Sequence, residues 1–225
     1  MIYVTGDTHG DRMRFFDNNM VGESSWGEND TLIICGDFGF IFRNNEGEQA
    51  FLDKLAEKPY TICFCDGNHE NFSALYLYPQ EMWMGGKVHK IRRNIFHLMR
   101  GQIFDICGKK FFTMGGAYSI DKYMRTEGVS WWKEELPCSI EYNEAIHNLK
   151  KANNEMDYII THTAPSEIIW RLLKNPDNHD KELTGFLDQV MHEIKFKRWF
   201  FGHWHMDWKI DEKFRAIWFD VECID

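Results

Sequence analysis

Five short motifs in this chain carry aspartate, asparagine and histidine, the residue types that bind metal ions for chemistry. The motifs are GDTHG (Gly6–Gly10), GDF (Gly36–Phe38), GNHE (Gly67–Glu70), THTAP (Thr161–Pro165) and GHWH (Gly202–His205). Imidazole nitrogens and carboxylate oxygens suit Zn, Mn, Fe or Co, and the sequence has no cysteine cluster for a closed thiolate site. The motifs therefore favour an open metal site.

A short apolar run precedes each motif. The runs IYVT, TLIIC, YTICFC, DYIIT and RWFF are β-branched or aromatic and end at glycine or a polar turn, which predicts buried strands. Ligands of α/β sheets bind in the crevice beyond the carboxyl ends of the strands. We therefore expect the five motifs to meet in one place and to form a dinuclear metal site.

The order of the motifs resembles that of the calcineurin-like metallophosphoesterases, which read D-x-H, G-D, G-N-H-D/E, a lone His and G-H-x-H. Five such motifs in one order, from Asp7 to His205, are hard to obtain by chance. The resemblance implies a hydrolase of phosphate esters that uses two divalent ions. Mn is favoured among Mn, Fe, Zn, Co and Ni.

The resemblance also implies a ligand set. The first ion would be held by Asp7, His9 and His205, the second by Asn68, His162 and His203, and Asp37 would bridge the two. Two carboxylates against two divalent ions leave a positively charged pocket, which suits a phosphate group. A hydroxide shared by the ions would attack phosphorus.

His69 is not among these ligands and would face the substrate. We predict that it is the acid that protonates the leaving alkoxide. Nearby cations would lower its pKa, so it needs a carboxylate or carbonyl partner. Asp66 and Glu70 are only the closest carboxylates in sequence, and the sequence does not identify the partner.

The second motif bears on the substrate. It reads GDFGFIF, whereas phosphoprotein phosphatases read G-D-x-V-D-R-G, so Phe40 stands where those enzymes have their second aspartate. The pair Arg43-Asn44 and the segments GNHENF and GKKFFTMGGAYS look similar to RNA lariat debranching enzymes, although those carry Cys in place of Asp7.

We therefore predict a phosphodiesterase, with a nucleotide or short nucleic acid as candidate substrate. A phosphomonoesterase or protein phosphatase is the alternative. A non-catalytic scaffold on the same fold is less favoured, because every ligand and His69 are present.

The segment from Gly115 to Pro137 mixes glycines, cations and adjacent tryptophans without a clear period. Irregular loops of this kind over a crevice commonly contact substrate. With Arg43, the candidate substrate-binding residues are Tyr118, Lys122, Arg125 and Trp132. The alternative is that Trp132 packs in the core and that Lys122 and Arg125 are solvated.

Composition sets the remaining expectations. The chain has 225 residues, 44% of them hydrophobic, which predicts a single domain over residues 1–225. A net charge of −9 argues against a protein that coats nucleic acid. No run of 18 apolar residues is present and the chain starts directly with a strand, so we expect a cytoplasmic protein without a membrane span. No obligatory protein partner is inferred.

The pattern of strands and helices predicts a layered α/β fold, in which two mixed sheets are stacked and flanked by helices. We expect residues 88–114 to form a β meander on the second sheet and residues 208–222 to form a hairpin. Helices are expected near residues 12–18, 48–57, just after 71, 139–154, 167–173 and 181–194.

Overall fold

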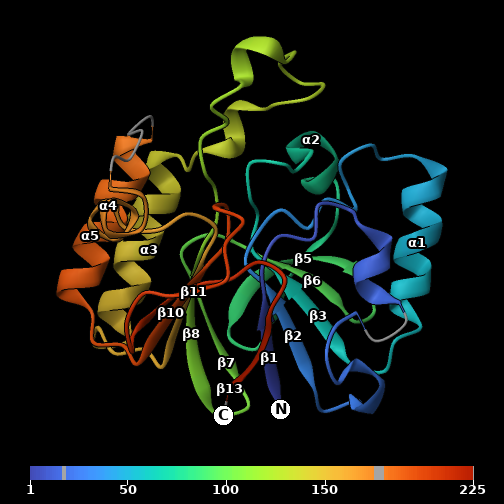
Figure 1. Cartoon of the computed structure of the whole chain (residues 1–225), viewed down its shortest axis with the longest axis horizontal. Coiled ribbons are helices and arrows are strands. Elements are labelled where there is room, and N and C mark those ends of the chain that lie inside the picture. Colours follow the sequence, from blue (N-terminus) through green and yellow to red (C-terminus); the bar gives the residue numbers. More distant parts are fainter. Residues whose placement is uncertain (17–18, 175–179, 225) are drawn as a thin grey trace.

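The computed structural model describes residues 1–16, 19–174 and 180–224. Two β-sheets pack face to face, and helices cover the outer face of each sheet (Figure 1). Both sheets are mixed, with parallel strands in the middle and antiparallel strands toward the edges. The predicted fold class, a layered α/β sandwich of two mixed sheets flanked by helices, is confirmed.

The first sheet has seven strands, of which four neighbours (β1, β2, β3 and β6) are parallel. In spatial order the strands are β13 (Val221–Ile224), β1 (Ile2–Thr5), β2 (Thr31–Ile34), β3 (Thr61–Phe64), β6 (Ile95–Leu98), β5 (Gly86–Arg92) and β4 (Gln80–Trp83).

The second sheet has six strands, with β12, β10, β9 and β8 parallel to one another. In spatial order they are β11 (Trp208–Lys209), β12 (Phe214–Ala216), β10 (Arg198–Phe201), β9 (Tyr158–Thr161), β8 (Lys109–Met114) and β7 (Gln102–Ile106).

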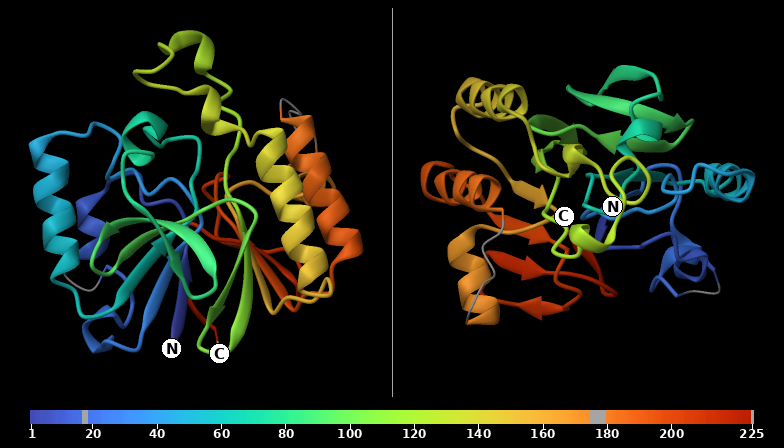
Figure 2. Two further views of the ribbon diagram at one scale, coloured as in Figure 1. Left: turned by 180° about the vertical axis from the view of Figure 1, so that it is seen from behind. Right: turned by 90° about the horizontal axis from the view of Figure 1, so that it is seen from above.

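The helices form the two outer layers. Seen from above, α3, α4 and α5 lie beside the second sheet and α1 lies beside the first (Figure 2). Their bounds are α1 (Glu46–Ala56), α2 (Phe72–Leu75), α3 (Ser139–Lys151), α4 (Ser166–Leu173) and α5 (Lys181–Glu193). Short 3-10 helices occur at η1 (Arg12–Phe15), η2 (Glu23–Ser25), η3 (Lys122–Met124) and η4 (Lys133–Glu135).

The central strands are buried on both faces, which explains their continuous apolar runs. Along β2, Leu32 and Ile34 pack in a cluster with Phe51 of α1. Ile33 points the other way, into the cluster between the sheets that includes Phe200 of β10. A one-residue shift in register would exchange these two sets of contacts, so packing on both sides fixes the strand.

Two expectations about the elements were wrong in part. The β segments from residue 88 to 114 do not form one meander, because β5 and β6 join the first sheet and only β7 and β8 join the second. The tail does make a hairpin, β11 with β12, but the chain then crosses to the first sheet as β13, beside β1. Both errors have one cause: a short strand does not reveal which sheet it joins.

The expected first helix is also shorter than predicted. It is the single 3-10 turn η1, and residues 17–18 at its expected end lie outside the described part of the chain. Cys63 of β3 and Cys65 at its end are both buried in the cluster between the sheets.

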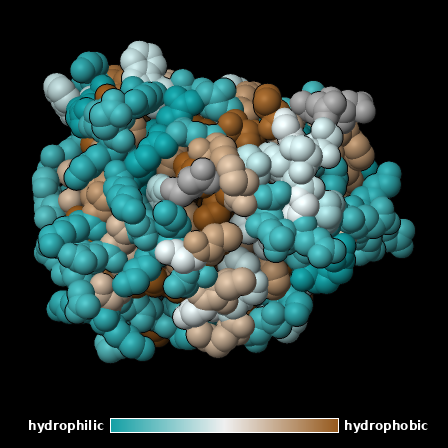
Figure 3. All heavy atoms as spheres, turned by 90° about the horizontal axis from the view of Figure 1, so that it is seen from below, coloured by the Kyte–Doolittle hydropathy of each residue, from teal (hydrophilic) through white to brown (hydrophobic). Residues whose placement is uncertain are grey.

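One segment projects beyond the sandwich at the carboxyl ends of the central strands. It contains η3 and η4 and is drawn in yellow-green at the top of Figure 1. The opposite face, near which both termini lie, is mainly hydrophilic around a small central group of hydrophobic side chains (Figure 3). Among the helices that the structure describes, none is long and apolar enough to span a membrane.

A buried polar network lies beside β3, β5 and β6. His97 contacts the Asp66 carboxylate (Nε2 to Oδ1, 3.0 Å) and the His89 ring (Nδ1 to Nδ1, 3.0 Å), and His89 Nε2 is 3.2 Å from Gln80 Nε2. These distances are satisfied when Gln80 donates to His89, His89 to His97 and His97 to Asp66. A second proton on His89 would break this series at Gln80.

This network makes stability depend on pH. Burial, with a smaller effect of His97, lowers the pKa of His89 to about 4 from 6.5. Folded His89 therefore binds a proton less readily than unfolded His89, and stability present above pH 6.5 is lost as the pH falls toward 4. We expect His89→Gln to reduce that loss by about 1–3 kcal/mol, measured by urea unfolding between pH 4 and 7. His147→Gln, which removes an exposed histidine on α3, is the control; equal pH dependence in the wild type and His89→Gln would contradict the assignment.

Candidate metal centre

The predicted site residues come together at one end of the sandwich. Asp7, Asp37 and Asn68 follow β1, β2 and β3 of the first sheet, which are adjacent and parallel. His162 and the pair His203 and His205 follow the parallel strands β9 and β10 of the second sheet. The site therefore lies where the carboxyl edges of the two sheets meet.

The first group of ligating atoms surrounds Asp7. Its Oδ2 is 3.2 Å from His205 Nε2 and 3.7 Å from His9 Nε2, and the two imidazole nitrogens are 2.8 Å apart. The Asp7 carboxylate is buried, whereas the side chains of His9 and His205 are 32% and 45% exposed. The three atoms can thus hold one ion that remains open to solvent.

The second group surrounds Asp37 and His162. The His162 ring places Nδ1 2.8 Å from the Cys35 carbonyl oxygen. Its Nε2 is then directed at two oxygens, Asn68 Oδ1 at 3.1 Å and Asp37 Oδ1 at 3.4 Å. The other Asp37 oxygen, Oδ2, is 3.6 Å from His9 Nε2. Asp37 therefore extends one oxygen toward each group, an arrangement that suits a ligand shared by two ions.

Backbone amides hold both carboxylates in place. His203 N–H lies 3.0 Å from Asp7 Oδ1, and His69 N–H donates to Asp37 Oδ1 at 2.8 Å. The His203 ring packs edge-on against the His162 ring, with 5.0 Å between ring centroids. Each motif thus supplies a side chain to the centre, and two of them also supply a donor to a carboxylate from another strand end.

Four of these residues have left-handed backbone conformations. The φ angles are 47° at His9, 48° at Asp37, 67° at His203 and 49° at His205. Such a conformation costs about 1–3 kcal/mol for a residue with a side chain. Strain concentrated on four residues of one site indicates that the turns are shaped to aim these side chains and not for stability alone.

The motif glycines have a packing role that sequence analysis did not identify. A Cβ atom on Gly202 would lie 2.0 Å from Asp7 Oδ1, and one on Gly67 would lie 2.0 Å from Asp37 Oδ1. On Gly36 it would lie 2.2 Å from His162 Nδ1. Each of these glycines therefore leaves room for a site residue carried by another strand end. The glycine that begins each of the G-D, G-N-H and G-H-x-H patterns was the feature of the sequence that could have indicated this packing role.

The electrostatics of the centre fit divalent cations. Burial would raise the pKa of Asp37, but His162 and the neighbouring imidazoles lower it well below the usual range. Burial would likewise lower the pKa of His162, yet Asp37 raises it. Positive charge is thus favoured beside Asp37 and His162, where two oxygens face one nitrogen. A divalent ion there would supply such a charge.

His69 lies beside the centre, but its partner differs from both expectations. Asp66 is bound by His97 and by Arg100, whose Nε donates at 2.8 Å, and Glu70 Oε1 accepts from Phe38 N–H at 2.7 Å. Neither contact leads to His69.

Arg125 is the group that faces His69. Its guanidinium is 3.3 Å from His69 Nε2, and it also donates to Asp121 at 2.7 Å. Burial, with a smaller effect of Arg125, lowers the pKa of His69. His69 could also serve as a ligand, because it forms a possible ion-binding group with His9 and Asp37.

Asn68 is oriented by a residue that sequence analysis missed. Its amide Nδ2 donates to Ser119 Oγ at 3.1 Å, which turns Oδ1 toward the centre. The Ser119 N–H in turn donates to the buried carboxylate of Glu135 at 3.3 Å. No motif marks Ser119 or Glu135, because they reach the site only through the path of the loop.

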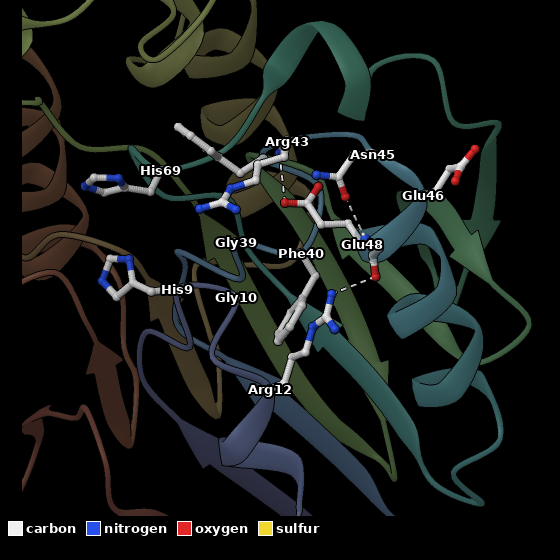
Figure 4. A pocket seen from close by; sticks show the side chains of 12 residues that line it. His9, Gly10, Arg12, Gly39, Phe40, Arg43, Asn45, Glu46, Glu48 and His69 are labelled. Carbon is white, nitrogen blue, oxygen red and sulfur yellow. Dashed lines mark hydrogen bonds between the residues drawn. The ribbon is translucent and has the colours of Figure 1, made fainter.

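Two hollows flank the centre. The first, which we call the Arg43 hollow, has a volume of about 750 Å³ and is bounded by His9, Arg12, Arg43, Glu48 and His69 (Figure 4). The second, the Arg125 hollow, has a volume of about 400 Å³ and includes His69, Tyr118, Arg125, His203 and Trp204. His69 borders both.

The other two candidates from the loop lie elsewhere. Trp132 is 3% exposed, packs in the first sheet's cluster and donates from Nε1 to Ser73 Oγ at 3.0 Å. The Lys122 ammonium lies over the Tyr118 ring, 4.1 Å from its centroid. Neither residue lines a hollow, so their positions favour the packing alternative for Trp132 and a supporting role for Lys122 at Tyr118.

The family assignment agrees with this geometry. A model of the calcineurin-like phosphoesterase family matches residues 1–207, and the chain therefore belongs to this family. It is a metal-dependent phosphoesterase, a hydrolase that acts on phosphate esters. The narrower similarity to RNA lariat debranching enzymes stays a prediction.

More specific relatives are distant. No curated protein matches the chain. Among solved structures, phosphopantetheinyl hydrolase (PptH) from Mycobacterium tuberculosis is 15% identical, with 96% of this chain and 87% of that chain covered and a TM-score of 0.43. We draw no conclusion on substrate from so distant a similarity.

The glycine contacts predict a specific loss. The Cβ atom introduced by Gly202→Ala would overlap with Asp7 Oδ1 and should displace the Asp7 carboxylate. The variant should therefore lose the ion held by Asp7, and its kcat/KM should fall by about 10² or more. Elemental analysis and a rate assay of the purified variant measure both effects. Gly185→Ala in α5 is the matched control, because no atom lies within 4 Å of its Cβ position and the change should stabilise the helix by up to about 1 kcal/mol. Unchanged metal content in Gly202→Ala would refute this role of the glycine.

Proposed function

We propose that the protein is a two-metal phosphodiesterase, with Mn as the favoured ion. The observation that carries the proposal is the convergence of ligand atoms from five strand ends on two buried carboxylates, Asp7 and Asp37. The proposed ligands are Asp7, His9 and His205 for one ion, Asn68, His162 and His203 for the other, and Asp37 between them.

The chain positions the reacting groups. When bound, two divalent ions would supply a hydroxide nucleophile at neutral pH by lowering the pKa of a shared water, and would neutralise charge on the phosphate oxygens. Asp37 and Asp7 fix the site through their amide contacts, and His162 is held by the Cys35 carbonyl. Because the supporting groups are backbone atoms, the site keeps its geometry without help from the substrate.

His69 and Arg125 are proposed to act together at the leaving group. In the free enzyme the contact with Arg125 opposes protonation of His69. A phosphate anion bound beside both side chains would favour the protonated ring of His69. His69 can then donate that proton to the departing oxygen, and Arg125 remains paired with the anion.

The two hollows support a diester as the substrate. A diester has two substituents on phosphorus, and the centre is flanked by a hollow on either side. Tyr118 and Trp204 line the Arg125 hollow and offer aromatic faces for stacking, which contributes about 1–3 kcal/mol for each nucleobase. A monoester would leave one hollow empty.

A substrate panel tests the proposal. We expect higher kcat/KM for bis(p-nitrophenyl) phosphate and dinucleotides than for p-nitrophenyl phosphate and nucleoside monophosphates, with Mn, Co, Zn and Ni assayed separately. Tyr118→Leu, which removes a proposed stacking face of the Arg125 hollow, should raise KM for dinucleotides more than for the small nitrophenyl diester, because only the larger substrate has a nucleobase to stack there. A clear preference for monoesters would instead favour the phosphomonoesterase or protein phosphatase alternative.

The leaving group tests the role of His69. His69→Ala should lower the rate on alkyl and nucleoside esters by about 10²–10⁴, because these alkoxides need a proton to depart. Nitrophenolate departs without one, so nitrophenyl esters should lose much less. Metal content must be unchanged, since loss of an ion would mean that His69 is a ligand. An equal loss on both classes with intact metals would show that His69 positions the substrate and does not protonate it.

A further inference from the structure

We propose that the Arg43 hollow binds a second phosphate group of the substrate, one that is not cleaved. The inference rests on the proposed phosphodiesterase function and names a class of substrate within it. One phosphate would lie at the metal centre, and the substituent that enters this hollow would carry another phosphate near its point of attachment.

The Arg43 guanidinium is the main observation. Its side chain has no hydrogen bond, ion pair or ring contact within the part of the chain that the structure describes; its only recorded bond is from the backbone N–H to Glu48 Oε1, at 2.8 Å. Figure 4 shows the guanidinium directed into the hollow, toward the side where His9 and His69 lie. An unpaired guanidinium offers a fork of donors that matches two phosphate oxygens.

The acidic residue beside Arg43 binds the backbone and not the guanidinium. The two Glu48 carboxylate oxygens accept from the backbone N–H groups of Arg43, at 2.8 Å, and of Asn44, at 2.6 Å. Glu48 thus holds the loop that carries Arg43, and each of its oxygens accepts from backbone N–H. Glu46 lies at the far end of the hollow from the two histidines (Figure 4). The end nearest the centre is therefore the cationic end.

Two glycines, Gly10 and Gly39, form part of the lining of the Arg43 hollow. They lie below the Arg43 guanidinium in the view of Figure 4, beside His9. A Cβ on Gly10 would lie 2.7 Å from Gly39 O, and one on Gly39 would lie 2.5 Å from Gly10 N. Both residues have positive φ, 68° and 73°. The two backbone segments thus pack directly on each other, and neither residue places a side chain in the hollow.

Arg12 extends the cationic surface. Its guanidinium donates to Gly47 O at 2.8 Å and lies over the Phe51 ring, 5.2 Å from the centroid. It is thus held in place, whereas Arg43 is free to bind. The expected ligand is a phosphate at Arg43, with Arg12 adding long-range attraction.

Matched substrates separate the two phosphates. The dinucleotide TpT lacks a second phosphate, whereas pTpT carries one at its 5′ end and TpTp carries one at its 3′ end. In P1,P2-diadenosine diphosphate the second phosphate is joined directly to the cleaved one. We expect one of the phosphate-bearing forms to have a kcat/KM about 10- to 100-fold above TpT. The form whose kcat/KM rises shows whether the second phosphate is separated from the cleaved one by a nucleoside or joined to it directly.

Arg43→Gln should remove most of this gain through KM, so that the ratio of kcat/KM for the phosphate-bearing form to kcat/KM for TpT falls toward one. Arg93→Gln, an exposed arginine outside both hollows, controls for the change in net charge. Arg43→Lys should recover part of the gain, because it keeps the charge and loses the fork.

Equilibrium binding gives a readout that does not depend on turnover. Calorimetry on the metal-loaded enzyme compares thymidine 3′,5′-bisphosphate with thymidine 5′-monophosphate, and adenosine diphosphate with adenosine monophosphate. The second phosphate should tighten binding in the wild type and not in Arg43→Gln. Equal affinities within both pairs in the wild type, or a gain that survives in Arg43→Gln, would overturn the inference. If phosphate esters are cleaved but a second phosphate raises kcat/KM for none of them, only this inference fails. If no phosphate ester is cleaved with any metal, the proposed function fails.

Discussion

Two buried carboxylates, Asp7 and Asp37, set the main constraint on this structure. A carboxylate removed from water needs compensating positive charge or hydrogen bonds. Here the compensation comes from backbone N–H groups of His203 and His69 and from the His162 ring. These partners follow other strands, two of them in the second sheet, so the site forms only when the two sheets are packed in the correct relative position. Divalent ions would complete the compensation, which links metal binding to the stability of the turns.

The sandwich serves this constraint directly. Parallel strands β1, β2 and β3 bring three motifs to one edge, and β9 and β10 bring two more from the facing sheet. The strands are fixed by packing on both faces, whereas the turns that follow them contain the left-handed residues and the closely approached glycines. The rigid core thus supports turns that would be strained in isolation. The substrate surface is built separately, from the Arg43 loop on one side and the Arg125 loop on the other.

The sequence predicted what depends on local pattern. Buried strands followed by Asp, His and Asn could be read from apolar runs and glycine turns, and their convergence followed from strand polarity. It did not predict contacts that depend on how distant segments pack. Trp132 looked like a stacking platform but is buried against the first sheet's cluster. Arg125, not a carboxylate, faces His69. The division of residues 88–114 between the two sheets could not be predicted either, because the sequence of a short strand does not indicate which strand it pairs with.

The most direct test of the central claim is anomalous scattering from crystals of the manganese-loaded protein. The account predicts two peaks about 3.5–4 Å apart, one beside Asp7, His9 and His205 and the other beside Asn68, His162 and His203, with an Asp37 oxygen directed at each. A single peak, or a second peak coordinated by His69 in place of the Asn68 group, would contradict the proposed centre.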